Sequence, residues 1–280
     1  MRWVGTPSQA VEPLFKQEIV SSEDGHGCLV SATRGGRIVV TATEHYACHL
    51  APIYLWMAGG MEAAIERGGL EIDSILCSRS KGGTAVDLGA GFGMHTIPLA
   101  HRGYSVLAID SSSILLELLR SYIESMPVRI AEDDLLTFRK HSDSQADLIL
   151  CMGDTLTHLS DLRSVEQLFS SVTAALRPGG QFVTTFRDYT SPLVEENRFI
   201  PVRSDNDRIL TCFLDYSSEH VAVHDLLHER NGSTWQLRVS AYRKLRIPPD
   251  WVATTLQSKG FAVRVEPGLS GMVRVVGEKG

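Results

Sequence analysis

Between residues 83 and 188, apolar positions form short continuous runs, and the stretches that separate these runs have apolar residues at helical spacing. Continuous apolar runs are typical of strands buried on both faces of a parallel sheet, with helices as the crossover connections. The expected strands are residues 84–89, 104–110, 128–130, 146–151 and 181–186, and the expected helices include Gly93–His101, Ser113–Ser125 and Leu162–Leu176. The pattern therefore predicts an α/β fold with a doubly wound, mainly parallel sheet.

After residue 200 the pattern changes to the alternation of apolar and polar residues that is typical of antiparallel strands. The runs are residues 208–216, 220–230 and 234–246, and Asn231-Gly232 predicts a tight hairpin turn between the last two. A buried face is expected from Val221, Val223, Leu227, Leu237, Val239 and Tyr242, leaving Arg238, Arg243 and Arg246 for solvent or an anionic group. A helix at Pro249–Lys259 and a strand pair within residues 261–278 then complete the main sheet.

The chain before residue 81 has a weaker pattern. Helical spacing of Leu50, Tyr54, Met57, Met61 and Ile65 predicts helices over residues 44–67, divided at Pro52 and at Gly59-Gly60. In the first 43 residues, Leu29–Val30 and Ile38–Thr41 could form short strands around Gly35-Gly36. The expected organisation is an N-terminal extension with a helical lid (residues 1–80), a core domain (81–200 and 247–280) and an antiparallel β insertion (201–246).

Composition narrows the classes of function. The 280 residues contain 27 Lys and Arg against 33 Asp and Glu, a net charge of −6, so no excess of positive charge is present to bind nucleic acid. No apolar run is long enough to cross a membrane. The five cysteines are scattered without a CxxC pair, which is typical of reduced thiols. We therefore expect a cytoplasmic protein that binds neither nucleic acid nor membrane.

A glycine-rich turn follows the first core strand, at Gly89-Ala90-Gly91-Phe92-Gly93. The spacing is GxGxG, and Met94 stands where a dinucleotide-binding fingerprint has its third glycine, which disfavours an NAD-dependent oxidoreductase. Asp110 ends the next strand about twenty residues later, where a carboxylate can accept hydrogen bonds from both ribose hydroxyls. Asp87, at the end of the first strand, is expected to support the turn through hydrogen bonds.

The motifs VDLGAGFG, AID, EDDLLTF, LILCMGDTLTHL and LRPGGQF occur in this order, and the set resembles the class I S-adenosylmethionine-dependent methyltransferases. The resemblance implies a Rossmann-like methyltransferase fold, with a seven-stranded mainly parallel sheet and a reversed last strand, and S-adenosylmethionine as the cofactor. It implies that Gly89, Gly91 and Gly93 face the amino acid and ribose parts, that Asp110 binds the ribose, and that Asp134 rather than Asp133 binds the adenine amino group. The remaining implied cofactor residues are Asp87, Ala90, Ser111, Leu135 and Cys151.

Two segments at the ends of strands bear on the methyl acceptor, MGDTLTHL (152–159) and TFRDYT (185–190). They resemble the glycine and sarcosine N-methyltransferases, and the resemblance implies His158, Arg187 and Tyr189 as catalytic candidates. A histidine of ordinary pKa can act as a base, and an arginine suits a carboxylate. The alternatives are that His158 bonds its own loop, that Tyr189 only packs, and that Arg187 pairs with Asp188 or Asp154.

The sequence also leaves the acceptor atom and part of the pocket open. A Pro-Pro-Tyr motif after the fourth strand is missing, which disfavours nucleobase and glutamine acceptors. We expect transfer to a small molecule, to nitrogen first and to oxygen or carbon as the alternatives; a non-catalytic cofactor-binding sensor or partner subunit is the hypothesis of another class. Tyr46 or Trp56 could place a ring beside the sulfonium. His224, Asp225 and His228 lack a recognised metal-binding spacing, so no metal is expected, whereas a homodimer is possible.

Overall fold

The computed structural model describes residues 45–76, 82–142 and 144–280, all within one compact unit of residues 37–280. Seven strands form the main sheet in the order β10-β11-β5-β4-β1-β2-β3. Their bounds are β1 Gly83–Leu88, β2 Tyr104–Asp110, β3 Val128–Glu132, β4 Ala146–Cys151, β5 Leu176–Phe186, β10 Phe261–Pro267 and β11 Val273–Lys279. Only β11 runs antiparallel to its neighbours, β5 and β10. The predicted seven-stranded, mainly parallel sheet is confirmed.

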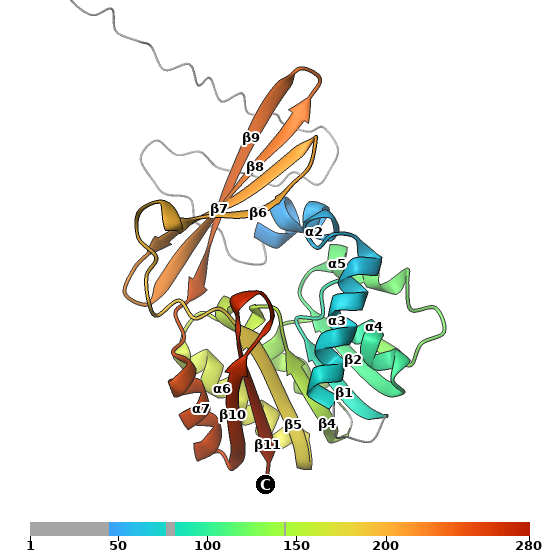
Figure 1. Ribbon diagram of the computed structural model, residues 1–280. Coiled ribbons are helices and arrows are strands. Elements are labelled where there is room, and N and C mark those ends of the chain that lie inside the picture. Colours follow the sequence, from blue (N-terminus) through green and yellow to red (C-terminus); the bar gives the residue numbers. More distant parts are fainter. Residues whose placement is uncertain (1–44, 77–81, 143) are drawn as a thin grey trace, which may run out of the picture. The chain divides into compact units, whose positions relative to one another are not determined.

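Helices cover both faces of this sheet (Figure 1). On one face lie α3 (Met61–Leu76), α4 (Thr96–His101) and α5 (Ser113–Arg120), and on the other lie α6 (Leu162–Ala175) and α7 (Pro249–Ser258). Strands such as β4, buried over most of their length, can therefore be continuously apolar. No helix in the described part of the chain is both long and apolar enough to span a membrane.

The boundaries differ from the prediction where the backbone is unusual. The helix expected from Gly93 begins at Thr96, because Gly89, Gly91 and Gly93 all have positive φ angles and form the preceding turn. Strand β5 begins at Leu176 instead of residue 181, and its pairing with β4 shifts register between Ala146 and Leu148. The helix expected to reach Ser125 ends at Arg120.

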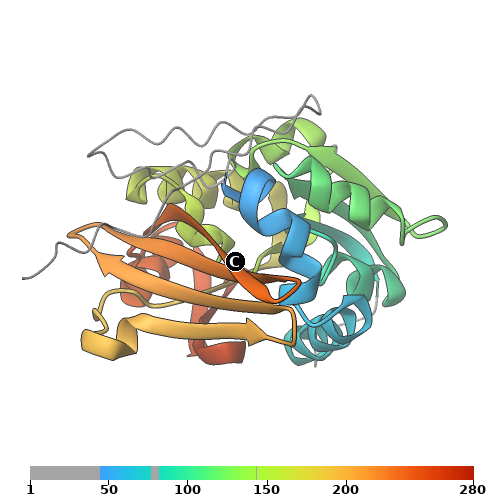
Figure 2. The same cartoon turned by 90° about the horizontal axis from the view of Figure 1, so that it is seen from above.

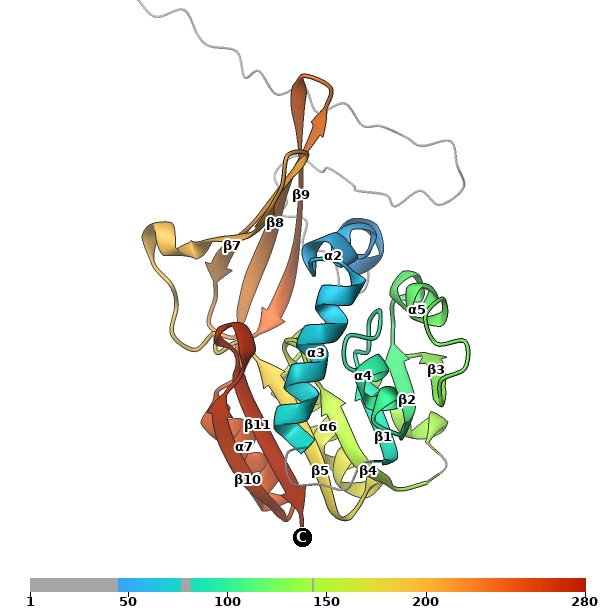
Figure 3. The same cartoon turned by 45° about the vertical axis from the view of Figure 1, so that its right-hand side comes forward.

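A second, antiparallel sheet has the order β6-β7-β8-β9 and stands at the carboxyl ends of the core strands (Figures 1 and 3). Its strands are β6 Phe199–Ser204, β7 Arg208–Tyr216, β8 His220–Asn231 and β9 Thr234–Leu245. The last three match the predicted runs. Strand β6 was not predicted because Pro201 interrupts its pattern, and as an edge strand it tolerates a proline.

One face of the second sheet is buried, and its composition corrects the predicted face. Of the residues predicted there, the buried set includes Val221, Val223, Leu227 and Tyr242, which pack with Leu210 and Leu214 of β7 and with Leu50 and Ile53. Leu237 and Val239 were predicted on this face, but they are 49% and 54% exposed. Side chains alternate along a strand, so these odd-numbered residues of β9 point away from the face that Tyr242 occupies.

Two short helical segments precede α3 and lie beside the second sheet over the end of the core (Figure 2). These are the π-helical turn η1 (Tyr46–Leu50) and α2 (Ala51–Met57). The change from η1 to α2 falls directly before Pro52, near the predicted division, but the backbone stays helical across it. Pro52 lies in the first turn of α2, after a widened turn in which the Ala51 amide donates to the Tyr46 carbonyl. The break occurs at Gly59-Gly60. The strands predicted at Leu29–Val30 and Ile38–Thr41 lie outside the described residues.

Two neighbouring glycines of α3 allow a matched test of how closely this helix packs against the loop that contains Met94. A Cβ on Gly68 would lie 1.9 Å from the Met94 carbonyl oxygen, whereas a Cβ on Gly69 would meet nothing nearer than the Arg102 guanidinium at 3.5 Å. Gly68→Ala should therefore lower the free energy of unfolding by about 3 kcal/mol. Gly69→Ala should raise it by about 0.5–1 kcal/mol, because alanine favours the helix. Urea denaturation measures both, and equal effects of the two substitutions would contradict the packing.

Candidate active site

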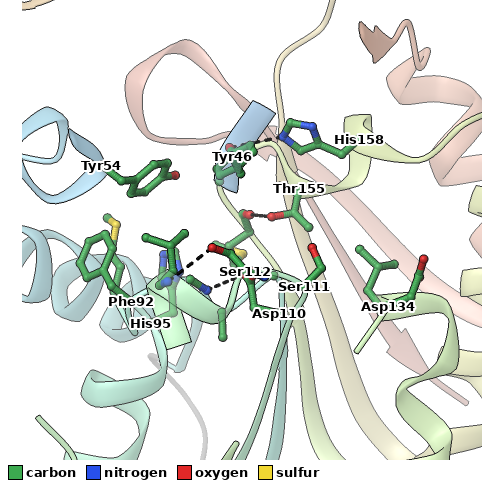
Figure 4. Close-up of a pocket in the computed structure, with 18 of the residues that line it drawn as sticks. Tyr46, Tyr54, Phe92, His95, Asp110, Ser111, Ser112, Asp134, Thr155 and His158 are labelled. Carbon is green, nitrogen blue, oxygen red and sulfur yellow. Dashed lines mark hydrogen bonds between the residues drawn. The ribbon is translucent and has the colours of Figure 1, made fainter. Parts of the chain in front are cut away.

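A pocket opens at the carboxyl ends of β1, β2 and β4, below η1 and α2 (Figure 4). One side of the pocket is built from core loops, and the other side from aromatic residues of the N-terminal helices and from the loop after β4. The lining comprises Tyr46, Tyr54, Gly89, Ala90, Gly91, Phe92, Met94, His95, Asp110, Ser111, Ser112, Leu115, Asp133, Asp134, Leu135, Met152, Gly153, Thr155, His158 and Leu159.

The glycine-rich turn forms the floor of the pocket. The Gly89 and Ala90 amides donate to the Ile109 carbonyl at 2.8 and 3.0 Å, which fastens the turn to β2. A Cβ on Gly89 would lie 2.4 Å from the Thr155 side chain, so only glycine fits beside the loop after β4. A Cβ on Gly91 would meet only Leu115, at 3.8 Å, and the backbone there is open to a ligand.

Asp110 ends β2 at the edge of this turn. Its Oδ2 accepts from the Gly91 amide at 2.7 Å and its Oδ1 accepts from the Ser112 amide at 2.8 Å. Burial raises the pKa of this carboxyl, while the amide hydrogen bonds act in the opposite direction. Each oxygen keeps a lone pair, and the residue lines the pocket. This arrangement fits a ligand with two neighbouring hydroxyls, such as a ribose.

Two further acidic residues, Asp133 and Asp134, follow β3. Asp134 caps the 3₁₀ helix η2 (Leu135–His141) by accepting from the Leu136 amide at 2.7 Å. Asp133 accepts from His141 Nε2 at 2.8 Å, and this contact is the main cause that lowers its pKa to about 2. Asp133, Asp134 and Leu135 all line the pocket, so either acid is placed to contact a ligand.

The opposite wall is aromatic. Tyr46 and Tyr54 have ring centroids 5.7 Å apart, and Tyr54 meets Phe92 edge-on at 5.8 Å. His158 lies at the end of the 3₁₀ helix η3 (Thr155–His158), with its ring 5.4 Å from Tyr46 and its Nε2 3.5 Å from the Tyr46 hydroxyl. In Figure 4 the rings of Tyr46, Tyr54 and His158 lie across the pocket from Asp110, Ser111 and Asp134.

The environment of His158 differs from that expected of a base with an ordinary pKa. Burial, and then the positive charge of Lys244, lower the pKa of His158 to about 3, although Asp154 acts in the opposite direction. The imidazole is therefore neutral at physiological pH. It stacks on Tyr242 with centroids 5.6 Å apart, and its buried Nδ1 has no hydrogen-bond partner among the described residues.

Behind this wall, Asp154 joins the loop after β4 to both sheets. Asp154 has a φ angle of 76°, in the left-handed region that residues other than glycine seldom adopt, and it is 5% exposed. Oδ1 accepts from the Arg187 amide at 2.9 Å, and Oδ2 accepts from the Tyr189 hydroxyl at 3.1 Å and from Lys244 Nζ. Burial would raise the pKa of Asp154, but Lys244 and these hydrogen bonds bring it below the ordinary value.

The structure places many of the predicted site residues together. Gly89, Ala90, Gly91, Asp110, Ser111, Asp134, Leu135, His158 and Tyr46 line the pocket. Asp87 lies behind the glycine turn, where it accepts from Thr96 Oγ1 at 2.7 Å, and Gly93 faces Leu119. Cys151 is fully buried in the core.

Three predicted residues have other surroundings. Trp56 lies against the second sheet, with the guanidiniums of Arg203 and Arg208 each 5.7 Å from its ring. Arg187 directs its side chain to the Ser270 carbonyl at 3.0 Å and does not line the pocket. Tyr189 is buried and bonds Asp154. Tyr189 therefore does more than pack, and only the backbone amide of Arg187, not its side chain, bonds Asp154.

Several residues of the site were not assigned to it from the sequence. Three of them, Asp133, Thr155 and Tyr54, lie within segments that the sequence analysis had already singled out. The acidic cap before η2 could have indicated Asp133, and helical spacing could have indicated Tyr54. Lys244 carried no such indication, since a lysine near the end of an alternating strand is usually exposed.

The comparisons with known proteins agree with this geometry. Residues 85–180 match the family model for the methyltransferase domain. The putative methyltransferase YqeM of Bacillus subtilis (strain 168) is 25% identical over 185 residues, which cover 64% of this chain and 73% of YqeM. A glycine/sarcosine/dimethylglycine N-methyltransferase of Actinopolyspora halophila is 25% identical over 115 residues, 39% of this chain and 20% of that protein.

Solved structures share the fold at low sequence identity. The structure of CalS10 with S-adenosylmethionine bound, an amino pentose methyltransferase from Micromonospora echinaspora, superposes with a TM-score of 0.70 at 15% identity, covering 83% of this chain and 97% of CalS10. The fold expected from the motif resemblance is therefore the fold observed.

The placement of Asp110 gives a direct test of the cofactor side. Asp110→Asn keeps the size of the side chain but removes its charge and one acceptor that faces the Gly91 amide. The dissociation constant for S-adenosylhomocysteine should rise about 10- to 100-fold, because a hydrogen bond to a charged group contributes about 1.5–3 kcal/mol. Calorimetry measures it, with Glu117→Gln on the exposed side of α5 as the control. An unchanged affinity in Asp110→Asn would remove this carboxylate from the site.

Proposed function

We propose that this chain, which carries a class I S-adenosylmethionine-dependent methyltransferase domain, methylates an amino nitrogen of a small, hydroxylated acceptor that bears no carboxylate. S-adenosylmethionine is its cofactor, and when bound it supplies an activated methyl group. Displacement at that methyl needs an aligned nucleophile, an acceptor that has lost its proton and the exclusion of water. For an acceptor that binds as a neutral amine, the chain's own residues are left with the alignment and the exclusion of water.

The two walls of the pocket suggest how the ligands are oriented. Asp110 suits the ribose and the acids after β3 suit the adenine, so the open glycine turn around Gly91 is left for the amino acid part. The methyl group would then face the aromatic wall of Tyr46, Tyr54 and His158. Aromatic rings favour a cation beside them and exclude water, which suits both a sulfonium and the methylammonium product.

The charges around the pocket bear on the acceptor. No lysine or arginine is among the described residues that line it. Arg187, the residue expected to bind a carboxylate, bonds the Ser270 carbonyl instead, and Lys244 is paired with Asp154. An acceptor with a carboxylate, such as glycine, would lack a cationic partner here. Neutral hydroxyl groups, by contrast, can bond the tyrosine hydroxyls and the imidazole.

The neutral imidazole of His158 is the single observation that carries the choice of nitrogen. With a pKa of about 3 it is too weak a base to take a proton from an alcohol, which disfavours an O-methyltransferase. It can still accept a hydrogen bond from the N–H of a neutral amine and so direct the nitrogen lone pair toward the methyl group. An amine needs no base in the site, because it exchanges its proton with water before it binds.

The name of one similar protein supports the same acceptor atom, and the name of another supports the acceptor class. The first is an N-methyltransferase of glycine, sarcosine and dimethylglycine, and the second is an amino pentose methyltransferase. The hydroxylated body that we propose resembles the second acceptor more than the first. The alternative of another class is a non-catalytic sensor or partner subunit. Turnover of a methyl acceptor distinguishes an enzyme from this alternative.

Acceptor class is tested with S-[methyl-¹³C]adenosylmethionine and a panel of amino sugars, glycine, sarcosine and a catechol. The expected product carries an N-¹³CH₃ group on an amino sugar, which NMR distinguishes from an O-methyl group by its chemical shift. His158→Asn should lower kcat about 100-fold while S-adenosylhomocysteine affinity stays within about threefold. Methylation of glycine or the catechol alone would contradict the proposal, and binding without any turnover would favour the sensor.

The pH dependence is a separate test of the role of His158. Because its pKa is about 3, the imidazole stays neutral as the pH rises, and only the acceptor loses a proton. The value of kcat/KM should therefore rise with pH and level off above the pKa of the acceptor amine, with no inflection from His158 between about pH 5 and about pH 9. An inflection near neutrality that disappears in His158→Asn would show instead that this histidine titrates as a base.

A further inference from the structure

Two side chains of strand β9 contact the loop after β4, one at each end of its short helix η3. Tyr242 and Lys244 share one face of β9, because they are two residues apart. The Tyr242 ring stacks on His158, with the centroids 5.6 Å apart, and Lys244 Nζ bonds Asp154 Oδ2. Asp154 is the N-cap residue directly before η3, and His158 is the last residue of η3. The helix that carries one wall of the pocket is thus fixed by two side chains of a different sheet.

Lys244 is buried, and its charge is accounted for by one partner. The residue is 8% exposed, and its surroundings include the ring of Tyr242 at 5.7 Å and the carboxylate of Asp154. Burial would lower the pKa of this ammonium, but Asp154 raises it above the ordinary value, so the pair is ionised. Burying two charges costs several kcal/mol for each ion unless they are paired, and such a pair is a weak source of stability. Its presence therefore calls for another explanation.

The second sheet does not need this pair to stay attached to the core. Arg246 donates to the carbonyls of Tyr189 and Thr190 at 2.9 and 2.8 Å, and His220 Nε2 lies 3.0 Å from the Ser160 carbonyl. These contacts cross the same boundary between the sheets. They leave the carboxylate of Asp154 untouched, so they provide matched controls.

The charges of the pair reach the pocket. Lys244 lowers the pKa of His158, and Asp154 raises it. The two charges shift the pKa of Tyr54 in the same two directions. With Lys244 present, the two effects oppose each other at the aromatic wall. Without it, a buried carboxylate would stand unbalanced behind the place proposed for the amine, and it would stabilise the ammonium, the form that cannot accept a methyl group.

We propose that Lys244 is a positioning residue of the methyl transfer: it holds Asp154, and with it Thr155 and His158, in register with the glycine turn, and it neutralises the carboxylate behind the wall that faces the acceptor. The part that concerns the acceptor rests on the proposed function, since it requires an amine. The part that concerns the loop does not, because Thr155 also fills the space beside Gly89 on the cofactor side.

The first experiment uses the full chain and needs no acceptor. His158 is followed by NMR of its ¹³C-labelled imidazole in the complex with S-adenosylhomocysteine, from about pH 4.5 to about pH 8. It should stay neutral in the wild type and in Lys244→Arg, whereas in Lys244→Met its midpoint should rise by about two pH units or more and so enter this pH range. The double variant Asp154→Asn/Lys244→Met removes both charges and should bring the midpoint back toward the wild type.

The second experiment measures methylation of the amino sugar that the wild type uses best. Lys244→Met should lower kcat about 100-fold, with KM and S-adenosylhomocysteine affinity within about threefold, and the pH profile should move to higher pH. Lys244→Arg should recover most of kcat, whereas Arg246→Met should leave kcat within about threefold of the wild type. The melting temperatures of Lys244→Met and Arg246→Met show whether a loss follows unfolding.

The outcomes separate the two proposals. If Lys244→Met leaves both the His158 midpoint and kcat unchanged, or if Arg246→Met lowers kcat as much as Lys244→Met does, the positioning role is wrong. If no amine is methylated by the wild type but the NMR midpoints behave as described, the proposed acceptor is wrong while the role of Lys244 in the loop holds.

Discussion

The buried ion pair between Asp154 and Lys244 is the contact on which the rest of the site depends. Asp154 has a left-handed backbone conformation and a carboxylate removed from water, two features that cost free energy unless the surroundings compensate for them. The compensation comes from two sheets: the amide and the tyrosine hydroxyl after β5, and the ammonium from β9. Because these donors come from two segments far apart in the sequence, the loop after β4 is fixed only when both segments are folded against it.

This constraint explains why the pocket has two chemically different walls. The core alone supplies the glycine turn and the acids at the ends of β2 and β3, which are local products of the α/β topology. The N-terminal helices and the second sheet supply the aromatic wall, and the loop that carries Thr155 and His158 lies between the two. A single loop therefore sets the distance between the two walls, and under the proposed function small displacements there are costly for an in-line transfer.

The sequence predicted what depends on local pattern and missed what depends on long-range contacts. The strands, the glycine turn and Asp110 were predictable because apolar runs and glycine spacing are set by neighbours along the chain. The direction of the Arg187 side chain was not, since it depends on Ser270, 83 residues away. The low pKa of His158 depends on burial and on Lys244. The exposure of Leu237 depends on which face of β9 turns inward. Each of these is decided by the packing of one sheet on another.

The arrangement of the two walls is tested most directly by a crystal structure of the full chain with S-adenosylhomocysteine. The account predicts ribose hydroxyls on the Asp110 carboxylate and the thioether sulfur facing the rings of Tyr46 and Tyr54, with His158 across the remaining space and the Asp154–Lys244 pair intact. A thioether directed away from these rings, or a ribose that does not contact Asp110, would contradict it.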